Sequence, residues 1–315
     1  MEKYVFGIDI GGTTIKCGLF TLVGEVLDKW EIQTNKAEEG KHILPDVCQT
    51  ITEKCEEKKI SRDEIKGVGI GVPGPVTDEG VVVVGVNINW ANETPVKAQL
   101  EALLKIPVAV GNDANVAALG ELWLGAAKGS RHAIMFTLGT GVGGGIIVDG
   151  KVVAGINGAG GEIGHSPAVT KDGNPCNCGK HGCLETVASA TGIVRETLKY
   201  LKLSSESSSL RDLKKIEAKD VFDVAKAGDI IGVKMVDQLG RYLGLAAANL
   251  TVALDPEKII IGGGVSKAGV ILIDAIKKYY QNYAFSSTRD VKFVLAELGN
   301  DAGIIGAAYL AKTTI

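Results

Sequence analysis

A strand, a glycine-rich turn and a second strand occur twice in this chain of 315 residues, and this repeat limits the folds open to it. In the first copy, residues 4–10 and 15–20 flank a Gly-Gly-Thr-Thr turn, and residues 25–32 continue as a third strand. In the second copy, residues 133–139 and 145–149 flank a Thr-Gly-Val-Gly-Gly turn, and residues 151–155 follow. Two similar meanders about 130 residues apart predict a duplicated domain.

Strands alternate with helices over the rest of the chain, which predicts an α/β fold. Further strands are expected at 65–72, 107–111, 258–261 and 292–296, and helices at 42–59, 100–105, 114–124, 188–202, 221–227, 231–254, 268–280 and 302–312. We expect a smaller α/β domain at 1–115, completed by the last helix at about 303–315, and a larger one at 116–302. Residues 203–219, which include Ser-Ser-Glu-Ser-Ser-Ser, are expected to form a mobile surface loop.

One imidazole and three thiols lie close together in the segment 161–185, at His165, Cys176, Cys178 and Cys183. They complete the tetrahedral Cys₃His shell that structural zinc uses. The other readings are a cysteine-rich loop without a metal and a disulfide framework, but the latter is typical of small secreted chains. The N-terminus has no basic segment followed by an apolar one, so no signal peptide is expected. We therefore predict a zinc site.

The two glycine turns are candidates for binding phosphate groups. In the first, Gly11 and Gly12 can offer backbone N–H groups, Thr13 adds a hydroxyl, and Asp9 can hold Mg²⁺ through water. Alone, this turn is equally compatible with an ordinary β-turn beside a solvated aspartate. A second turn containing Thr140 and Gly141 favours a polyphosphate held by both turns.

Neither of two common nucleotide-binding motifs explains the glycine-rich segments. Residues 69–74 and 139–144 match G-x-G-x-x-G, but a dinucleotide site needs a helix directly after the glycines, and neither match has one. The sequence has no G-x-x-x-x-G-K-[ST] motif either.

Polar residues at a strand-to-helix junction and around the cysteine segment suggest a site for a polyol. Asn112 and Asp113 can cap a helix, or Asp113 can accept the proton of a substrate hydroxyl. Glu162 and Glu185 are either surface carboxylates or acceptors for the same hydroxyls. His165 can bind metal through one ring nitrogen and donate to a hydroxyl through the other.

The charge and hydropathy of the chain argue against two kinds of partner. The net charge is −3 and no long basic run occurs, so we expect no nucleic-acid partner. No apolar run reaches the roughly 18–20 residues of a membrane span, so no membrane partner is expected.

Several motifs together resemble the ROK (repressor, open reading frame, kinase) family over nearly the whole chain. They are DIGGT at 9–13, GVPGPV at 71–76, GNDAN at 111–115, LGTGVGGG at 138–145, GEIGH at 161–165 and CNCGKHGCLE at 176–185. The resemblance implies an actin/hexokinase-like (ribonuclease H-like) duplicated α/β fold with two domains around a cleft that holds a sugar. It is closest to the ATP-dependent glucokinases of the family, which implies transfer of phosphate from ATP to the 6-hydroxyl of glucose in glycolysis, with Mg²⁺ and structural Zn²⁺.

The resemblance also implies a role for individual residues. Asp113 matches the catalytic base, and the sugar contacts match Gly74, Asn112, Asp113, Glu162, His165 and Glu185. The ATP contacts match Asp9, Gly11, Gly12, Thr13, Thr140, Gly141, Gly262, Gly263 and Gly264. The zinc ligands match His165, Cys176, Cys178 and Cys183.

The sequence leaves the sugar open. The family's Asn-Leu-Gly-Trp appears here as Asn87-Ile-Asn89-Trp90, and the change to Asn89 affects a loop near the sugar. A kinase for mannose, fructose, N-acetylmannosamine or N-acetylglucosamine is the alternative. The repressors of the family carry a DNA-binding domain before the first turn, and Asp9 leaves no room for one, so we expect an enzyme. The family implies a cytoplasmic homodimer or homotetramer.

Overall fold

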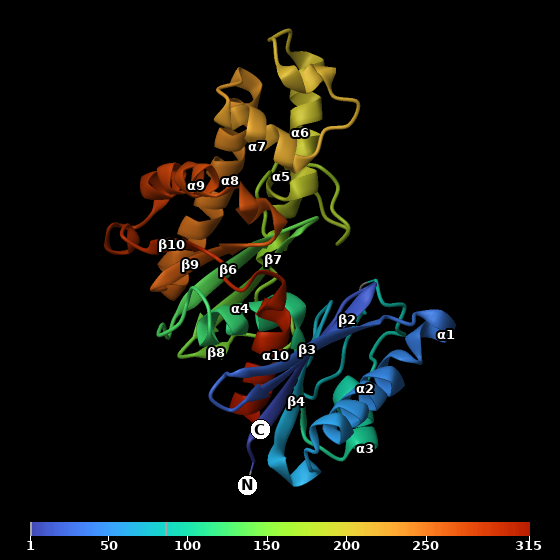
Figure 1. Ribbon diagram of the computed structural model, residues 1–315. Helices are drawn as coiled ribbons and strands as arrows, with labels where there is room; N and C mark the ends of the chain where they lie inside the picture. Colours follow the sequence, from blue (N-terminus) through green and yellow to red (C-terminus); the bar gives the residue numbers. More distant parts are fainter. Residues whose placement is uncertain (1, 86) are drawn as a thin grey trace. The chain divides into compact units, whose positions relative to one another are not determined.

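The computed structural model describes residues 2–85 and 87–315, and its strands form two five-stranded sheets (Figure 1). The first has the order β3-β2-β1-β4-β5 and the second β10-β9-β6-β7-β8. The strands of the first are β1 (Tyr4–Ile10), β2 (Thr14–Thr21), β3 (Val26–Gln33), β4 (Ile65–Val72) and β5 (Val108–Asn112). Those of the second are β6 (Ala133–Leu138), β7 (Val142–Val148), β8 (Lys151–Val152), β9 (Lys258–Gly262) and β10 (Lys292–Leu295).

The two sheets share one strand order, which confirms the duplicated plan. The central strand is β1 in one sheet and β6 in the other, and the two strands that follow it in the chain lie on one side of it. On the other side, β4 and β5 run parallel to β1, just as β9 and β10 run parallel to β6. In the first sheet, β2 pairs with β1 and β3 pairs with β2, both in antiparallel orientation.

Ten helices connect or cover these strands within the described residues. They are α1 (Ala37–Gly40), α2 (Ile43–Lys58), α3 (Val96–Leu104), α4 (Asp113–Trp123), α5 (Glu185–Ala188), α6 (Ala190–Leu203), α7 (Ala218–Lys226), α8 (Ile230–Leu254), α9 (Val270–Tyr283) and α10 (Ala302–Thr314). Over the same part of the chain, none of these helices is long and apolar enough to cross a membrane.

The chain divides into two compact units. One contains the chain up to Gly129 together with Gly145–Gly161 and Leu298–Ile315, and the other contains Ser130–Gly144 and Glu162–Glu297. The first unit therefore extends beyond residue 115, where the sequence suggested a boundary. The reason is that α4 packs against α10, and α10 packs against β1 and β4.

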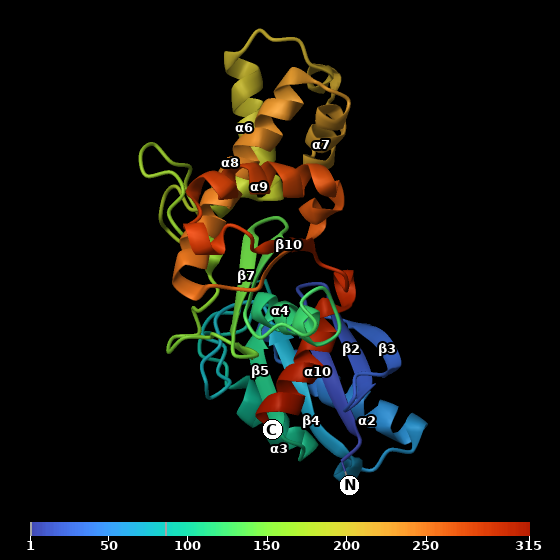
Figure 2. The same cartoon turned by 90° about the vertical axis from the view of Figure 1, so that its left-hand side faces the viewer.

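The alternation of side chains along β1 places a different layer on each face of the first sheet. Phe6, Ile8 and Ile10 are buried in a core with side chains of α2 and α3. Val5 points to the opposite face, where α10 lies along the strands (Figure 2). Gly7 shares that face, and a β-carbon at Gly7 would lie 1.8 Å from the carbonyl oxygen of Ile304. The backbone of α10 therefore rests directly on β1.

Helices α5 to α9 all belong to the second unit. The 25-residue helix α8 contacts α6, α7 and α9, and it buries one apolar stripe against them. Residues 203–219, expected to be a mobile loop, instead contain a 3₁₀ turn at Ser209–Asp212. The guanidinium group of Arg211 donates to three backbone carbonyl groups there, and Leu210 is buried. The serine-rich composition concealed this ordered segment.

Several element boundaries differ from the sequence prediction by a few residues, and two of them concern α3 and β7. α3 begins at Val96, four residues earlier than expected, directly after Pro95. Proline is well suited to the start of a helix because it lacks an N–H group. β7 begins at Val142, so Gly143 and Gly144 belong to a strand rather than to the turn.

Candidate active site

The first glycine turn joins β1 to β2. The N–H of Gly11 donates to the carbonyl oxygen of Thr14 at 3.0 Å, and the hydroxyl of Thr34 donates to the carbonyl oxygen of Gly11 at 2.7 Å. Gly11 is thus engaged in closing the turn, and Thr13 is exposed at its tip. The donors that this turn can present to a phosphate are those of the residues after Gly11.

Asp9 lies two residues beyond the contact between Gly7 and α10, on the same face of β1. A β-carbon at Gly303 would lie 2.4 Å from Oδ2 of Asp9, so the carboxylate sits against the first turn of α10. Burial raises the pKa of the Asp9 carboxyl, and the nearby Lys16 ammonium opposes the increase. Asp9 is a half-buried carboxylate close to the phosphate turn, as a ligand for a hydrated cation would be.

Asn112 and Asp113, at the junction of β5 and α4, have separate roles. Oδ1 of Asn112 accepts from the N–H groups of Ala114 and Asn115 at 3.0 and 3.1 Å, which caps α4. Nδ2 of Asn112 donates to the carbonyl oxygen of Gly74 at 3.2 Å. Asp113 is exposed on the first turn of α4, and its Oδ1 accepts from the N–H of Ala114 at 2.8 Å. Because Asn112 is the cap, the carboxylate of Asp113 is left at the surface.

The loop that departs from the family's Asn-Leu-Gly-Trp is held by two buried side chains. Ile88 and Trp90 are buried, and the indole N–H of Trp90 donates to the carbonyl oxygen of Gly40 at 3.1 Å. Asn89 lies between them with φ 60°, a left-handed conformation that asparagine adopts more readily than most residues. The backbone here suits glycine, and asparagine preserves it while adding an exposed side chain.

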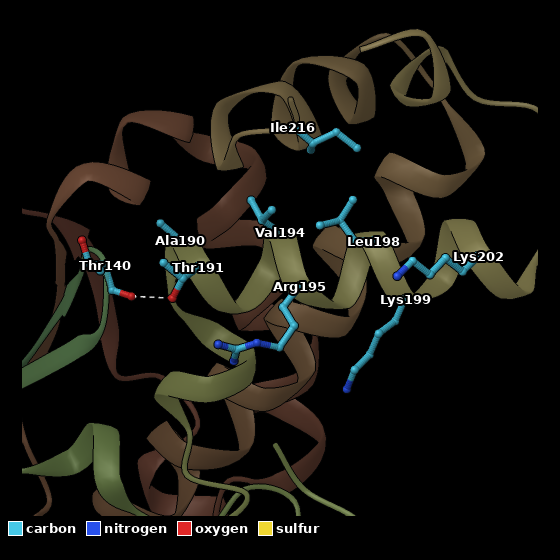
Figure 3. A pocket seen from close by; sticks show the side chains of 9 residues that line it. All are labelled: Thr140, Ala190, Thr191, Val194, Arg195, Leu198, Lys199, Lys202 and Ile216. Carbon is cyan, nitrogen blue, oxygen red and sulfur yellow. Dashed lines mark hydrogen bonds between the residues drawn. The ribbon is translucent and has the colours of Figure 1, made fainter. Parts of the chain in front are cut away.

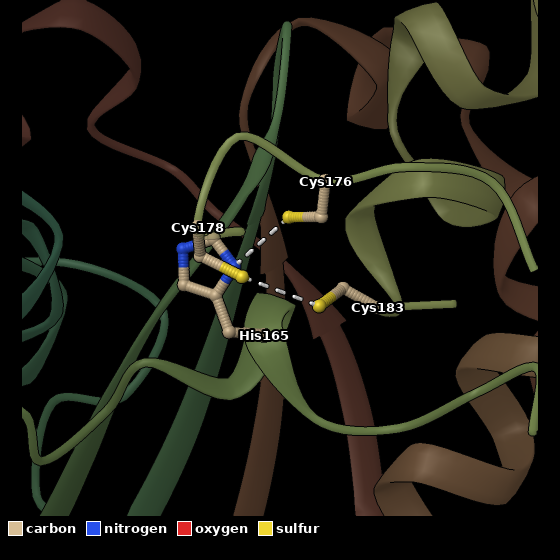
Figure 4. A group of neighbouring side chains, drawn as sticks. All are labelled: His165, Cys176, Cys178 and Cys183. Carbon is tan, nitrogen blue, oxygen red and sulfur yellow. Dashed lines mark hydrogen bonds between the residues drawn. The ribbon is translucent and has the colours of Figure 1, made fainter. Parts of the chain in front are cut away.

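In the second unit, the four predicted metal ligands converge (Figure 4). Their ligand atoms all lie within 4.8 Å of one another. Sγ of Cys176 is 3.5 Å from Nδ1 of His165, and the Sγ atoms of Cys178 and Cys183 are 3.6 Å apart. Cys176 and Cys183 are buried, whereas Cys178 is exposed.

The separations of 3.5 and 3.6 Å match those between the ligands of a tetrahedral zinc ion. Bonds of about 2.3 Å from zinc to sulfur and about 2.0–2.1 Å to nitrogen place neighbouring ligand atoms roughly 3.5–3.8 Å apart. Desolvation raises the pKa of the Cys176 thiol, and the backbone N–H of Lys180 lowers the pKa of the Cys178 thiol. Three thiols and one imidazole are one of the donor sets that structural zinc uses.

Both predicted carboxylates lie beside His165. Oε2 of Glu162 is 3.8 Å from Nε2 of His165, while Oε1 of Glu185 is 3.7 Å from Nδ1. Oε1 of Glu185 also accepts from the thiol of Cys176 at 3.0 Å. Since Nδ1 faces the thiols, Nε2 is the nitrogen left on the side of Glu162.

The second glycine turn, between β6 and β7, approaches Glu185. The N–H of Gly139 donates to the carbonyl oxygen of Gly141 at 3.0 Å, and Thr140 is exposed at the tip. A β-carbon at Gly141 would lie 2.6 Å from Oε2 of Glu185. Any side chain at position 141 would therefore displace this carboxylate.

A groove beside the second turn was not predicted from the sequence (Figure 3). It has a volume of about 580 Å³ and follows one face of α6 from Thr140 and Thr191 toward Lys199 and Lys202. Ala190, Val194, Leu198 and Ile216 supply its apolar wall. The sequence predicted a helix here, but only the fold shows that Ile216 lies opposite Val194 (Figure 3).

The third glycine cluster lies at the end of β9. Gly262 is buried against Met135, whereas Gly263 and Gly264 are exposed. Gly263 has φ 80° and precedes the 3₁₀ turn Gly264–Ala268. The hydroxyl of Ser266 donates back to the carbonyl oxygen of Gly263 at 2.7 Å.

The structure thus assembles the predicted residues into groups within each unit. The first unit contains Gly74 with Asn112 and Asp113, and Asp9 beside the first turn. The second unit contains the metal ligands with Glu162 and Glu185, and the turn with Gly141.

Two matching α/β sheets, each with a glycine turn after its central strand, define the actin/hexokinase-like class of folds. A family model described as the ROK family matches residues 5–314, and the chain belongs to this family. The resemblance and the fold class inferred from the sequence are both confirmed.

The relatives of the chain include sugar kinases of similar length. A protein named glucokinase from Halalkalibacterium halodurans is 46% identical over 99% of this chain and 96% of its own length. An N-acetylgalactosamine kinase from a Shewanella species is 32% identical over 97% of this chain and 96% of its own length. A solved ROK family glucokinase from Streptomyces griseus, in complex with glucose and AMPPNP, has a TM-score of 0.75 and 34% identity, covering 98% of this chain and 99% of that chain.

Proposed function

We propose that this protein is an ATP-dependent glucokinase that transfers the γ-phosphoryl group of ATP to the 6-hydroxyl of glucose, giving glucose 6-phosphate and ADP. The observation that carries the proposal is the position of Asp113, whose carboxylate is exposed because Asn112 provides the helix cap. The 46% identity to a protein named glucokinase supports glucose as the acceptor.

Asp113 acts as the general base in this proposal. Its carboxylate accepts the proton of the 6-hydroxyl while that oxygen bonds to the γ-phosphorus and the bond to the leaving ADP oxygen breaks. Proteins catalyse phosphoryl transfer mainly by positioning the reacting groups and stabilising charge, so the base would also orient the 6-hydroxyl. Lewis-acid stabilisation of the transferred group is the chemistry that Mg²⁺ supplies, and Asp9 would hold that ion through water.

The sugar contacts we propose are Gly74, Asn112, Asp113, Glu162, His165 and Glu185. Carboxylates accept from sugar hydroxyls, and the close approach at Gly141 fixes the direction in which Glu185 points. Nε2 of His165, on the side away from the thiols, is the ring nitrogen that remains for the sugar.

The proposed ATP contacts are Asp9, Gly11, Gly12, Thr13, Thr140, Gly141, Gly262, Gly263 and Gly264. Thr13 and Thr140 are both exposed at the tips of closed turns, which supports phosphate binding by the two turns. The groove along α6 begins at Thr140, and its apolar wall suits the base and ribose of the nucleotide.

We propose that His165, Cys176, Cys178 and Cys183 hold a structural zinc ion. Four converging ligands are enough for a closed tetrahedral shell, which would leave no position for substrate on the metal. The ion would fix the segment that carries His165 and Glu185, and the chemistry would remain with the protein groups.

A kinase for another hexose or an N-acylhexosamine is the alternative that an observation supports. Asn89 adds an exposed side chain where the family has glycine, and a relative of 32% identity is named for N-acetylgalactosamine. A coupled ADP-release assay with glucose, mannose, fructose, glucosamine, N-acetylglucosamine and N-acetylmannosamine decides between them. Glucose should give the highest kcat/KM. A higher value for an N-acetyl sugar would overturn the choice of glucose, and no ADP release with any sugar would overturn the kinase.

The family also supports a homodimer or homotetramer that acts in glycolysis in the cytoplasm. Light scattering on a sizing column measures the number of 32.9 kDa chains in the particle. A monomer at micromolar concentration would contradict the proposed assembly. Cell fractionation, followed by the assay above, tests the location.

A further inference from the structure

Two hydroxyl groups at the start of α6 lie between Glu185 and the second glycine turn. Oγ of Ser189 donates to the carbonyl oxygen of Glu185 at 2.7 Å. Oγ1 of Thr191 donates to the carbonyl oxygen of Thr140 at 2.7 Å (Figure 3). The two hydroxyl oxygens are 3.0 Å apart. They connect segments more than forty residues apart in the sequence.

The hydroxyl group of Ser189 has two possible acceptors for its proton. Each hydroxyl carries one proton, and Thr191 uses its own for Thr140. Ser189 can therefore donate to the carbonyl group of Glu185 or to Oγ1 of Thr191, while its oxygen accepts from the N–H of Gly192 at 2.9 Å in either case. The two hydroxyl groups therefore form a hydrogen-bonded chain between the carbonyl groups of Glu185 and Thr140.

Two further contacts fix the same pair of segments. The N–H of Ala190 donates to the carbonyl oxygen of Gly139 at 2.8 Å, and the carboxylate of Glu185 lies against Gly141. Ser189 is fully buried, and Thr191 is exposed at the end of the groove on α6. The turn therefore cannot move without straining a contact to the start of α6.

We infer that Thr191, together with Ser189, is a positioning residue that couples sugar binding at Glu185 to nucleotide binding at the Gly139–Thr140–Gly141 turn. We expect each ligand to increase the affinity for the other, and thermodynamic linkage requires the two increases to be the same factor. The inference rests on the proposed function, because it needs the sugar at Glu185 and the nucleotide at the turn.

Thr191→Val is the informative substitution. Valine keeps the shape of threonine and removes the hydrogen bond to Thr140. Ser189 also caps α6, so Ser189→Ala would combine loss of the bridge with loss of the cap. Thr191→Ser restores the hydroxyl. Thr197→Val is the control, because the Thr197 hydroxyl donates to Ile193 within the same helix and does not reach the turn.

Calorimetry measures the dissociation constant of glucose with and without magnesium AMPPNP, and the ratio of the two constants is the coupling factor. We expect AMPPNP to tighten glucose binding in the wild type. In Thr191→Val the coupling factor should fall by about 2- to 10-fold, the range for one hydrogen bond, with little change in the affinity for glucose alone. Thr191→Ser and Thr197→Val should keep the wild-type factor.

A wild-type factor in Thr191→Val, or no coupling in the wild type, would overturn the inference. Hydrogen exchange supplies a readout that needs no ligand. Thr191→Val should speed amide exchange in peptides covering residues 138–142 and 184–188, and unchanged exchange in both would also count against the bridge. If Thr191→Val speeds amide exchange in both peptides but the wild type phosphorylates no sugar, the proposed function is overturned and the bridge between the two segments remains.

Discussion

The side-chain amide of Asn112 donates to the carbonyl oxygen of Gly74 across 3.2 Å, while the oxygen of the same amide caps α4. One side chain therefore joins the loop after β4 to the helix that begins with Asp113. The two ends of the amide have different functions, and substitutions can separate them.

Asn112→Asp should keep the cap and remove the donor to Gly74. Aspartate caps helices as well as asparagine does, so the free energy of unfolding should change little, while the KM for the sugar should rise. Asn112→Ala should lose both functions, and its free energy of unfolding should fall by about 1 kcal/mol. Urea denaturation and sugar titrations measure the two effects. Equal unfolding free energies for both variants would contradict the assignment of the cap.

Asp113→Asn should lower kcat by roughly 10²-fold or more, the scale of general base catalysis, with sugar affinity largely kept. Steady-state kinetics and calorimetry measure the two quantities. Asp46→Asn is a suitable control, because Asp46 is also a first-turn carboxylate of a helix in the same unit. A near-normal kcat in Asp113→Asn would exclude this residue as the base.

Gly141→Ala should displace Glu185, because the added methyl carbon would lie 2.6 Å from its carboxylate oxygen. We expect kcat/KM for the sugar to fall by roughly 10-fold or more, as happens when positioning is lost. In Gly139→Ala, in the same turn, no atom lies within 4 Å of the added carbon, so kcat/KM should fall less than in Gly141→Ala. If the two variants lose activity equally, flexibility of the turn rather than the place of Glu185 explains the effect.

Asp9→Asn should make the protein more stable and less active. Burial raises the pKa of Asp9 in the folded state, so its charge destabilises the fold at neutral pH. The variant should therefore unfold at higher denaturant concentration at pH 7. The difference should shrink as the pH falls through the raised pKa, where Asp9 becomes protonated. The kcat should fall on the order of 10²-fold because the water-mediated contact of Asp9 to Mg²⁺, which stabilises the charge of the phosphates, is lost. A wild type more stable than Asp9→Asn at pH 7 would refute this account.

The purified protein should contain one zinc ion per chain, measured by plasma mass spectrometry. Cobalt substitution should give the visible absorption of a tetrahedral thiolate site. Cys178→Ser should lose most of the metal and lower the thermal midpoint, because structural zinc contributes directly to folding. Cys48→Ser removes a cysteine far from the cluster in sequence and should keep the metal. A fully folded, fully active protein after complete removal of zinc would show that the metal does not shape the sugar site.

Much of the fold follows from local patterns. The repeated strand and glycine turn predicted the duplicated sheets, because hydrophobic periodicity and glycine positions are properties of short segments. The metal ligands could also be predicted from the sequence, since ligand type and spacing within 165–183 are enough to suggest zinc. The conformation of segment 203–219 could not be predicted in this way, because it depends on hydrogen bonds from the Arg211 side chain to backbone carbonyl groups.

The finer geometry of the site was not accessible from the sequence. The contact of Glu185 with Gly141 and the bond from Thr191 to Thr140 join residues more than forty positions apart. A sequence read segment by segment contains no information on which distant backbone groups will meet. The division of labour between Asn112 and Asp113 was likewise left open, since either residue type can cap a helix.

The packing of α10 on β1 has a consequence for how the chain is made. β1 leaves the ribosome long before α10, yet one of its faces is covered only when residues 302–314 have been synthesised. Until then Val5, Phe20 and Ala109 lack their partners from α10. We expect the nascent first unit to expose an apolar sheet face throughout synthesis of the second, and to be a substrate for chaperones during that interval.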